Sequence, residues 1–160
     1  LFEKDEIWNA KARDLARRTF ELTTFLTNVA QNFQLDTQLN AKLTYHDSCS
    51  SQRELSIKQQ PRQLLAQIDG LELVEMEDTD VCCGFGGTFC VKYPDISNKM
   101  VGKKLKRVEE TEADILTAGD LGCLMNIAGK AKREGSQIQV RHIAEILAGD
   151  LETPAIGEGS

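Results

Sequence analysis

The sequence lacks the features that mark nucleic-acid-binding and membrane-spanning proteins. Its 160 residues carry 19 Lys and Arg against 25 Asp and Glu, which gives a formal net charge of −6. A nucleic-acid-binding protein normally presents a basic face, so this balance argues against that class. No run approaches the roughly 18 apolar residues of a membrane-spanning helix. No signal-peptide pattern opens the printed sequence, so we expect a cytoplasmic protein with no integral membrane segment and no nucleic-acid partner.

The signatures of several enzyme classes are also missing. The glycines of CCGFGG are not followed by the Lys-Ser/Thr of a phosphate-binding loop, and they do not form a regular G-x-G-x-x-G. The sequence contains no Ser-His-Asp spacing, no flavin fingerprint and no second metal motif. No substrate pocket is evident from it, so we expect no catalytic residues in this chain.

What is present is a pattern of alternating strands and helices. The composition, 41% hydrophobic and 28% charged, suits a globular domain with a real core. Residues 3–30 have a helical pattern with a bend near Thr19. Beyond them, the expected strands cover 41–49, 71–76, 113–120 and 138–140. The expected helices cover 61–68, 95–110 (started by Asp95), 123–135 (closed by Gly135) and 143–149. We therefore expect a helical segment over 1–35, an α/β domain over 36–149 and a flexible tail over 150–160.

This alternation predicts an α/β fold, with a parallel sheet of about four strands and helices on both faces. Binding sites in such sheets form beyond the carboxyl ends of the strands. Cys49, the Cys82–Cys83 pair and Cys123 each lie at or beyond the carboxyl end of a different expected strand. Four thiols from three regions would therefore meet at one edge, with their sulfurs within about 8 Å of one another, the span of one cluster.

The five cysteines do not have the pattern of a disulfide framework, because their number is odd and their spacing is wide. Reduced thiols that serve as ligands, redox groups or small core residues fit better. Free cysteine is among the most buried residue types, and for Cys90 we expect the role of a core residue.

The stretch CCGFGG points to a ligand larger than one ion. Adjacent side chains of a strand point to opposite faces, so Cys82 and Cys83 can serve one site only if the backbone turns. Gly84 permits that turn, and Gly86 and Gly87 let the backbone pass close to a bulky ligand. A tetrahedral zinc usually takes cysteines two to four residues apart, whereas a cluster offers separate attachment points. This favours an iron–sulfur cluster, with zinc as the alternative.

The motifs YHDSC, then CCGFGGTF after 32 residues, then GDLGCLMNIAG, resemble the cysteine-rich CCG domain. That domain occurs in one of the subunits of heterodisulfide reductase, in iron–sulfur subunits of glycolate oxidase and anaerobic glycerol-3-phosphate dehydrogenase, and in the lactate utilisation A group. RTFELTTFL and CCGFGGTF look like the second half of the last group, and the similarity covers most of residues 10–148. Family members carry two such halves, so the resemblance implies that a first half is missing from this sequence.

The resemblance implies four metal ligands, at Cys49, Cys82, Cys83 and Cys123. The family pattern ends in C-x-x-C, but here Asn126 takes the last position, and the full five-cysteine motif resembles one that holds a noncubane [4Fe-4S] cluster. With four thiols an ordinary [4Fe-4S] cluster is the simpler expectation. Cys123 would open a helix whose dipole favours its thiolate.

Three further polar residues lie near the matched motifs or the last helix. His46, three residues before Cys49, either holds its loop, hydrogen-bonds a cluster sulfur or replaces a thiol. Asn126 either donates a hydrogen bond to the cluster or packs. His142, before the last helix, is a weaker candidate of the same kind.

The resemblance further implies an electron-transfer subunit of a multi-subunit oxidoreductase that oxidises lactate or a related 2-hydroxy acid. Its partners would be companion redox subunits (flavin or iron–sulfur proteins) and the missing first half, and self-association is an option. Two alternative functions without redox chemistry remain open. The chain could be a structural zinc module that docks partner subunits, or a metal-free interaction module.

Overall fold

A computed structural model describes residues 2–30 and 33–159, and the chain divides into two compact units, Leu1–Phe33 and Gln34–Ser160. The first unit contains helices α1, Glu6–Arg17, and α2, Leu22–Asn28. Asp5 caps α1 because its carboxylate accepts hydrogen bonds from the N–H groups of Ile7 and Trp8. The two helices are separate, which confirms the bend expected near Thr19.

The second unit is built on a parallel sheet of the strands β1 (Gln38–Tyr45), β2 (Asp69–Leu73), β3 (Ile115–Ala118) and β4 (Gln139–His142). The strands lie in the order β2-β1-β3-β4, and all three neighbouring pairs are parallel. The α/β fold class is confirmed.

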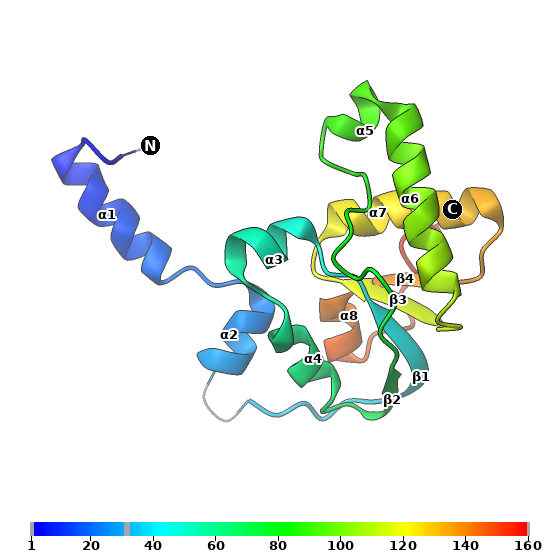
Figure 1. The fold of residues 1–160 in the computed structure, drawn as a ribbon. Coiled ribbons are helices and arrows are strands. Elements are labelled where there is room, and N and C mark those ends of the chain that lie inside the picture. The colour runs from blue at the N-terminus through cyan, green and yellow to red at the C-terminus, as the bar shows by residue number, and fades with distance from the viewer. Residues whose placement is uncertain (1, 31–32, 160) are drawn as a thin grey trace. The chain divides into compact units, whose positions relative to one another are not determined.

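Helices cover both faces of this sheet (Figure 1). Helices α6 (Pro94–Glu109) and α7 (Leu121–Glu134) pack against each other on one face. Helices α4 (Gln59–Leu65) and α8 (Ile143–Ala148) pack against each other on the other face. This division follows from right-handed crossovers, because the chain leaves β1 toward one edge and leaves β3 toward the opposite edge.

The strand order places a topological switch between β1 and β3. Tyr45, the last residue of β1, pairs with Thr117 of β3, and the N–H of His46 donates to the carbonyl of Thr117 at 2.9 Å. In open α/β sheets a crevice forms at such a switch, outside the carboxyl ends of the strands. The residues that follow β1 and β3 are therefore the ones placed to line a site.

The core between the sheet and helices α6 and α7 reaches this edge. Leu105, Leu116 and Leu124 are fully buried in it, and Cys83 and Cys123 belong to the same cluster of buried side chains. Two of the five thiols are thus at the boundary between the core and the carboxyl edge of the sheet.

The structure corrects several expected boundaries. Two short helices, α3 (Cys49–Leu55) and α5 (Phe89–Lys92), were not predicted. The expectation that Asp95 starts α6 is wrong, because Tyr93 is the N-cap and Pro94 takes the first turn. Helix α7 begins two residues before Cys123, although Gly135 closes it in the left-handed conformation as expected.

The C-terminal segment returns to the sheet. Ala155 is buried, and the N–H of Ile156 donates to the carbonyl of Val140 at 2.8 Å. The flexibility expected for residues 150–160 concerns motion and stays a prediction. Across residues 2–30 and 33–159, no helix has the length and apolar character needed to cross a membrane.

Candidate metal centre

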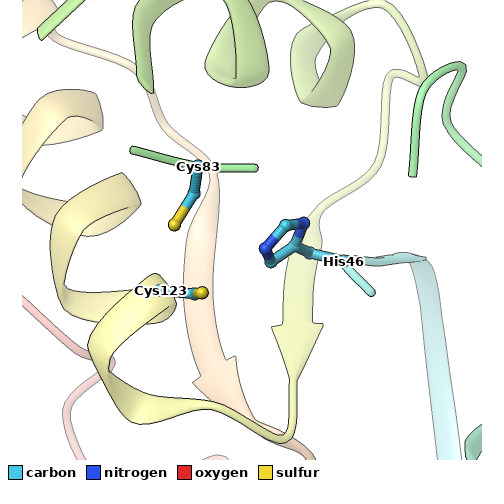
Figure 2. A group of neighbouring side chains, drawn as sticks. All are labelled: His46, Cys83 and Cys123. Atoms are coloured by element: carbon cyan, nitrogen blue, oxygen red, sulfur yellow. The ribbon is translucent and has the colours of Figure 1, made fainter. Parts of the chain in front are cut away.

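Three side chains from distant parts of the sequence meet at the β1/β3 switch (Figure 2). A ring nitrogen of His46 and the Sγ atoms of Cys83 and Cys123 all lie within 4.8 Å of one another, and all three residues are buried. His46 follows β1, Cys83 lies in the loop after β2, and Cys123 lies in the first turn of α7 after β3. We call this group the inner trio.

A buried ion pair fixes the loop that carries His46. The carboxylate of Asp47, whose side chain is 1% exposed, accepts two hydrogen bonds of 3.0 Å from the guanidinium of Arg62. Arg62 also donates to Glu75 at 2.9 Å and lies over the ring of Tyr45, 5.2 Å from its centroid. This arrangement ties the end of β1 to α4 and to the segment after β2, so the backbone at His46 has little freedom.

The backbone of the cysteine doublet is held by α6 and α7. Gly84 has φ +83°, and a Cβ added there would lie 2.9 Å from Cβ of Met100. The hydroxyl of Ser97 donates to the carbonyl of Gly84 at 2.8 Å, and the amide of Asn126 donates to the carbonyl of Cys83 at 2.9 Å. The turn that Gly84 was expected to make is therefore real, and Asn126 acts on the backbone of the doublet.

The first turn of α7 sets the position of Cys123. Its N–H donates to the carboxylate of Asp120, the N-cap, at 3.1 Å. Asp120 also accepts a 2.8 Å hydrogen bond from Ser50 of α3, which links the two helix starts. Gly122 leaves room for Phe85, whose ring would lie 2.4 Å from an added Cβ. Sequence reasoning missed Gly122, because only the packing of Phe85 reveals the need for a glycine there.

Cys49 and Cys82 form a more exposed pair, which we call the outer pair. Cys49 is the first residue of α3, whose N-cap Ser48 accepts from the N–H of Ser51 at 3.1 Å. The Sγ of Cys82 accepts a 3.3 Å hydrogen bond from the N–H of Gly84. Burial raises the pKa of Cys82, and the nearby Cys83 and Cys49 thiols raise it further. It stays a prediction that the sulfurs of all four cysteines, in the inner trio and the outer pair, lie within about 8 Å of one another, the span of one cluster.

The thiols of the site differ in acidity. The pKa of Cys83 is lowered because its thiolate accepts a hydrogen bond from Cys123, and nearby His46 lowers it further against the effect of burial. The pKa of Cys123 is raised because it donates to Cys83 and because it is buried. Burial also raises the pKa of Cys82, against the hydrogen bond from Gly84. Cys83 and Cys123 therefore share one proton and one negative charge. The deprotonated thiolate is the form that binds metal.

An orphaned histidine provides a test of whether these residues fit a metal. His46 is fully buried, and neither ring nitrogen makes a hydrogen bond of normal geometry within residues 2–30 and 33–159. A buried polar group left without a partner is costly and calls for an explanation such as an ion. Its ring faces two sulfurs, and imidazole and thiolate together are typical ligands of transition metals. The residues fit a metal centre.

Other candidate residues have separate positions. Cys90 lies in α5, outside the inner trio, and is only partly buried, so the expected role of a core residue is wrong. Its Sγ donates to the carbonyl of Gly87 at 3.1 Å. Gly86 and Gly87 both have positive φ, but an added Cβ at Gly86 would meet Phe89, and at Gly87 it would meet nothing within 4 Å. Their role beside a bulky ligand stays a prediction.

His142 has a structural role. Its ring nitrogen Nδ1 accepts a hydrogen bond from the N–H of Ala144 at 3.2 Å, and the backbone N–H of His142 donates to the carboxylate of Glu145. Together these bonds form the capping box of α8.

The comparison with known proteins assigns the chain to a family. The profile of the CCG family, described as "Cysteine-rich domain", matches residues 43–128, which include the inner trio and the outer pair. The chain belongs to this family.

Curated relatives carry a shared name. "Lactate utilization protein A 2" of Bacillus cereus (strain AH820) is 47% identical over 151 residues, which cover 94% of this chain and 62% of the relative. "Lactate utilization protein A" of Geobacillus sp. (strain WCH70) is 46% identical over 147 residues, covering 92% of this chain and 62% of the relative. The chain thus spans about 62% of the length of the curated relatives it matches, and the resemblance inferred from its motifs is confirmed.

Proposed function

We propose that this chain is the iron–sulfur-binding, electron-transferring part of a cytoplasmic multi-subunit oxidoreductase that oxidises lactate or a related 2-hydroxy acid. The observation that carries the proposal is the inner trio, in which two thiols and an orphaned histidine are buried together at the switch point of the sheet. The name shared by the relatives supports the link to lactate. Residues 36–149 would form the redox domain, and residues 1–35 a separate helical segment.

In this proposal Cys49, Cys82, Cys83 and Cys123 hold a [4Fe-4S] cluster, which takes four thiolates. When bound, the cluster supplies one-electron transfer. The chain keeps the inner thiols out of water and fixes the doublet through hydrogen bonds to the carbonyls of Cys83 and Gly84. His46 supplies a polar group that gains a partner in the centre.

Partner subunits would supply the remaining chemistry. Removal of a hydride from a hydroxy acid is usually the work of a flavin or nicotinamide, so we assign it to companion redox subunits. Apolar residues exposed near the site support docking there: Val81 is 51% exposed, Leu121 52% and Met125 49%. A first CCG half or a second copy of this chain could use the same surface.

A structural zinc site is the second candidate, and one observation favours it. Ligands that bind one zinc at about 2.0–2.3 Å lie no more than about 4.6 Å apart. The atoms of the inner trio, within 4.8 Å of one another, are near that span. Under this candidate Cys49 or Cys82 would complete a tetrahedral site, and the chain would dock partners without redox chemistry.

Metal analysis of anaerobically purified protein separates the two candidates. Iron with acid-labile sulfide, and a visible absorption that bleaches on reduction, would support the electron-transfer proposal. Zinc without sulfide would support the structural site, and protein free of both metals after anaerobic purification would contradict both. Reduction of the iron centre by lactate only when companion subunits are added would then support the partner-dependent role.

A further inference from the structure

Helix α6 buries a lysine within an apolar stripe. Lys104 is 2% exposed, and its helical neighbours on the buried face include Val101, Leu105 and Val108, which are 0–1% exposed. Lysine is almost never fully buried unless its charge is paired. A methionine or leucine would fill the same space at less cost, so the ammonium group calls for a reason.

The ammonium of Lys104 binds backbone carbonyls and no carboxylate. Its Nζ donates to the carbonyl of Asp78 and, at 3.3 Å, to that of Thr79. Within the part of the chain that the structure describes, no carboxylate forms an ion pair with it. Arg62, by contrast, is offset by both Asp47 and Glu75. Lys104 therefore brings a positive charge to the loop that carries the doublet, and its direct contacts do not neutralise this charge.

The contacts of Lys104 lead directly to the proposed centre. The two carbonyls that it holds lie four and three residues before Cys82, in the loop that carries the doublet. Ser97, two turns earlier on the same buried face of α6, holds the carbonyl of Gly84 at the other end of the doublet. One face of α6 thus donates hydrogen bonds to the loop both before and after the two cysteines.

Charge complementarity explains why a cation is kept here. Burial lowers the pKa of the Lys104 ammonium, and the negative charges of Asp78 and then Cys83 act in the opposite direction. Cys83 packs in the same buried cluster as Val101, Leu105 and Val108, the neighbours of Lys104 on α6. Cysteine ligands must be deprotonated, so a centre with several of them carries negative charge. A buried cation nearby is stabilised by such a centre and stabilises it in turn.

We propose that Lys104 is a positioning residue that orders the doublet loop and supplies the buried positive charge that offsets the negative charge of the thiolate centre. The charge acts more strongly on the more negative, reduced state, so it raises the reduction potential of the centre. This second part rests on the proposed iron–sulfur function, whereas the ordering of the loop does not.

The loop-ordering role is tested on metal-free protein by hydrogen exchange. Lys104→Met keeps the length of the stem and removes the donor, so amides of residues 78–84 should exchange roughly tenfold faster, as expected for a lost hydrogen bond to a charged group. Lys104→Gln retains an amide donor and should exchange nearly as slowly as the parent. Lys103→Met, an exposed neighbour on α6, is the matched control and should change nothing. Unchanged exchange in Lys104→Met would overturn the ordering role, whether or not the protein binds iron.

The electrostatic role is tested by the midpoint potential of the reconstituted centre. Lys104→Met and Lys104→Gln should both lower the one-electron equilibrium constant about tenfold, a fall of about 59 mV. Lys104→Arg should keep the parent potential, and so should Lys103→Met. If Gln restores the potential as well as the slow exchange, the charge has no role and this part is wrong. If no variant can be reconstituted because the parent holds no iron, the proposed function fails and the electrostatic part falls with it, while the exchange result still stands.

Discussion

The thiols of the inner trio and of the outer pair have contrasting properties. Cys82 and Cys83 are neighbours in the chain, yet Cys83 is 1% exposed whereas Cys82 is half-buried. The pKa of Cys83 is lowered by its hydrogen bond from Cys123, and the pKa of Cys82 is raised by burial without a comparable donor. Cys83 packs in the core cluster beside helices α6 and α7, whereas Cys82 stays nearer the surface.

The difference in burial shows which of these residues the fold holds in place without a ligand. The inner trio comes from the ends of β1 and β3 and from a loop pinned by Ser97 and Asn126, so it is held before any ligand arrives. The outer pair comes from the first residue of α3 and from the exposed side of the doublet. We expect the inner residues to decide whether metal binds, and the outer residues to adjust how tightly.

The largest effect should come from removing an inner thiol. Cys83→Ser or Cys123→Ser should abolish nearly all bound metal, because each removes a ligand that the core holds in place. Cys49→Ser or Cys82→Ser should leave a fraction of the metal, bound more weakly. Metal per chain after anaerobic purification is the measurement.

Cys90→Ser is the matched control for this series and should keep the full metal content. Equal losses in the inner and outer variants would remove the distinction between them. Loss of metal in the control would mean that the ligand set is wrong.

The next largest effect concerns the ion pair that holds the loop of His46. Arg62→Met leaves the carboxylate of Asp47 buried without its partner, which should cost about 3–5 kcal/mol of unfolding free energy. Arg53→Met, on the exposed side of α3, should change it by less than about 0.5 kcal/mol. Urea unfolding of the metal-free proteins gives both values. A small loss in Arg62→Met would show that the inner trio does not depend on this pair.

Two glycine substitutions test the turn that follows the cysteine doublet. Gly84→Ala places a side chain on a residue with left-handed φ, and its Cβ would press on Met100 and on the backbone of Ser97 in α6. We therefore expect a loss of about 2–4 kcal/mol in the free energy of unfolding. Gly87→Ala meets only the left-handed φ, since nothing lies near its added Cβ, so about 1 kcal/mol is expected. Thermal unfolding of the two variants compares them directly, and similar losses would contradict the tight packing at Gly84.

A further prediction concerns the pH dependence of stability in metal-free protein. In the unfolded chain Cys83 and Cys123 share the ordinary pKa of 9.0, whereas in the fold the first proton of the pair leaves below that value and the second above it. Below pH 9 the unfolded state therefore binds more protons, and stability rises with pH; above pH 9 the sign reverses. Each unit of net shift is worth about 1.4 kcal/mol.

Cys83→Ser should flatten this dependence, and Cys90→Ser should preserve it. Unfolding midpoints measured at about pH 6 and about pH 8 would show the rise. A stability that falls over this interval in the parent would contradict the shared thiolate.

Much of this architecture could be predicted from local sequence patterns. The alternation of apolar strands and amphipathic helices predicted the parallel sheet, and strand ends predicted that thiols would gather at its carboxyl edge. Gly84 and Gly135 were correctly placed in left-handed positions because a turn and a helix end require them. These features depend on short-range periodicity and backbone conformation, which the sequence expresses directly.

Features that depend on tertiary contacts were missed. The start of α3 at Cys49 depends on the cap at Ser48, in a stretch that looks like the continuation of a strand. A lysine in the sequence suggests an exposed position, so the burial of Lys104 within an apolar stripe was not predicted. The need for glycine at 122 arises only because Phe85 packs on it. The orphaned ring of His46 likewise becomes visible only when both of its neighbours in space are known.

Locating the metal in crystals of anaerobically purified protein tests the central claim most directly. Anomalous difference density recorded on both sides of the iron edge, and then of the zinc edge, identifies the element and its position. The account predicts iron density bounded by Cys83, Cys123 and His46 and reaching the outer pair. Iron density elsewhere, or no anomalous density among these residues, would contradict it, and zinc density at the inner trio would move the function to the structural site.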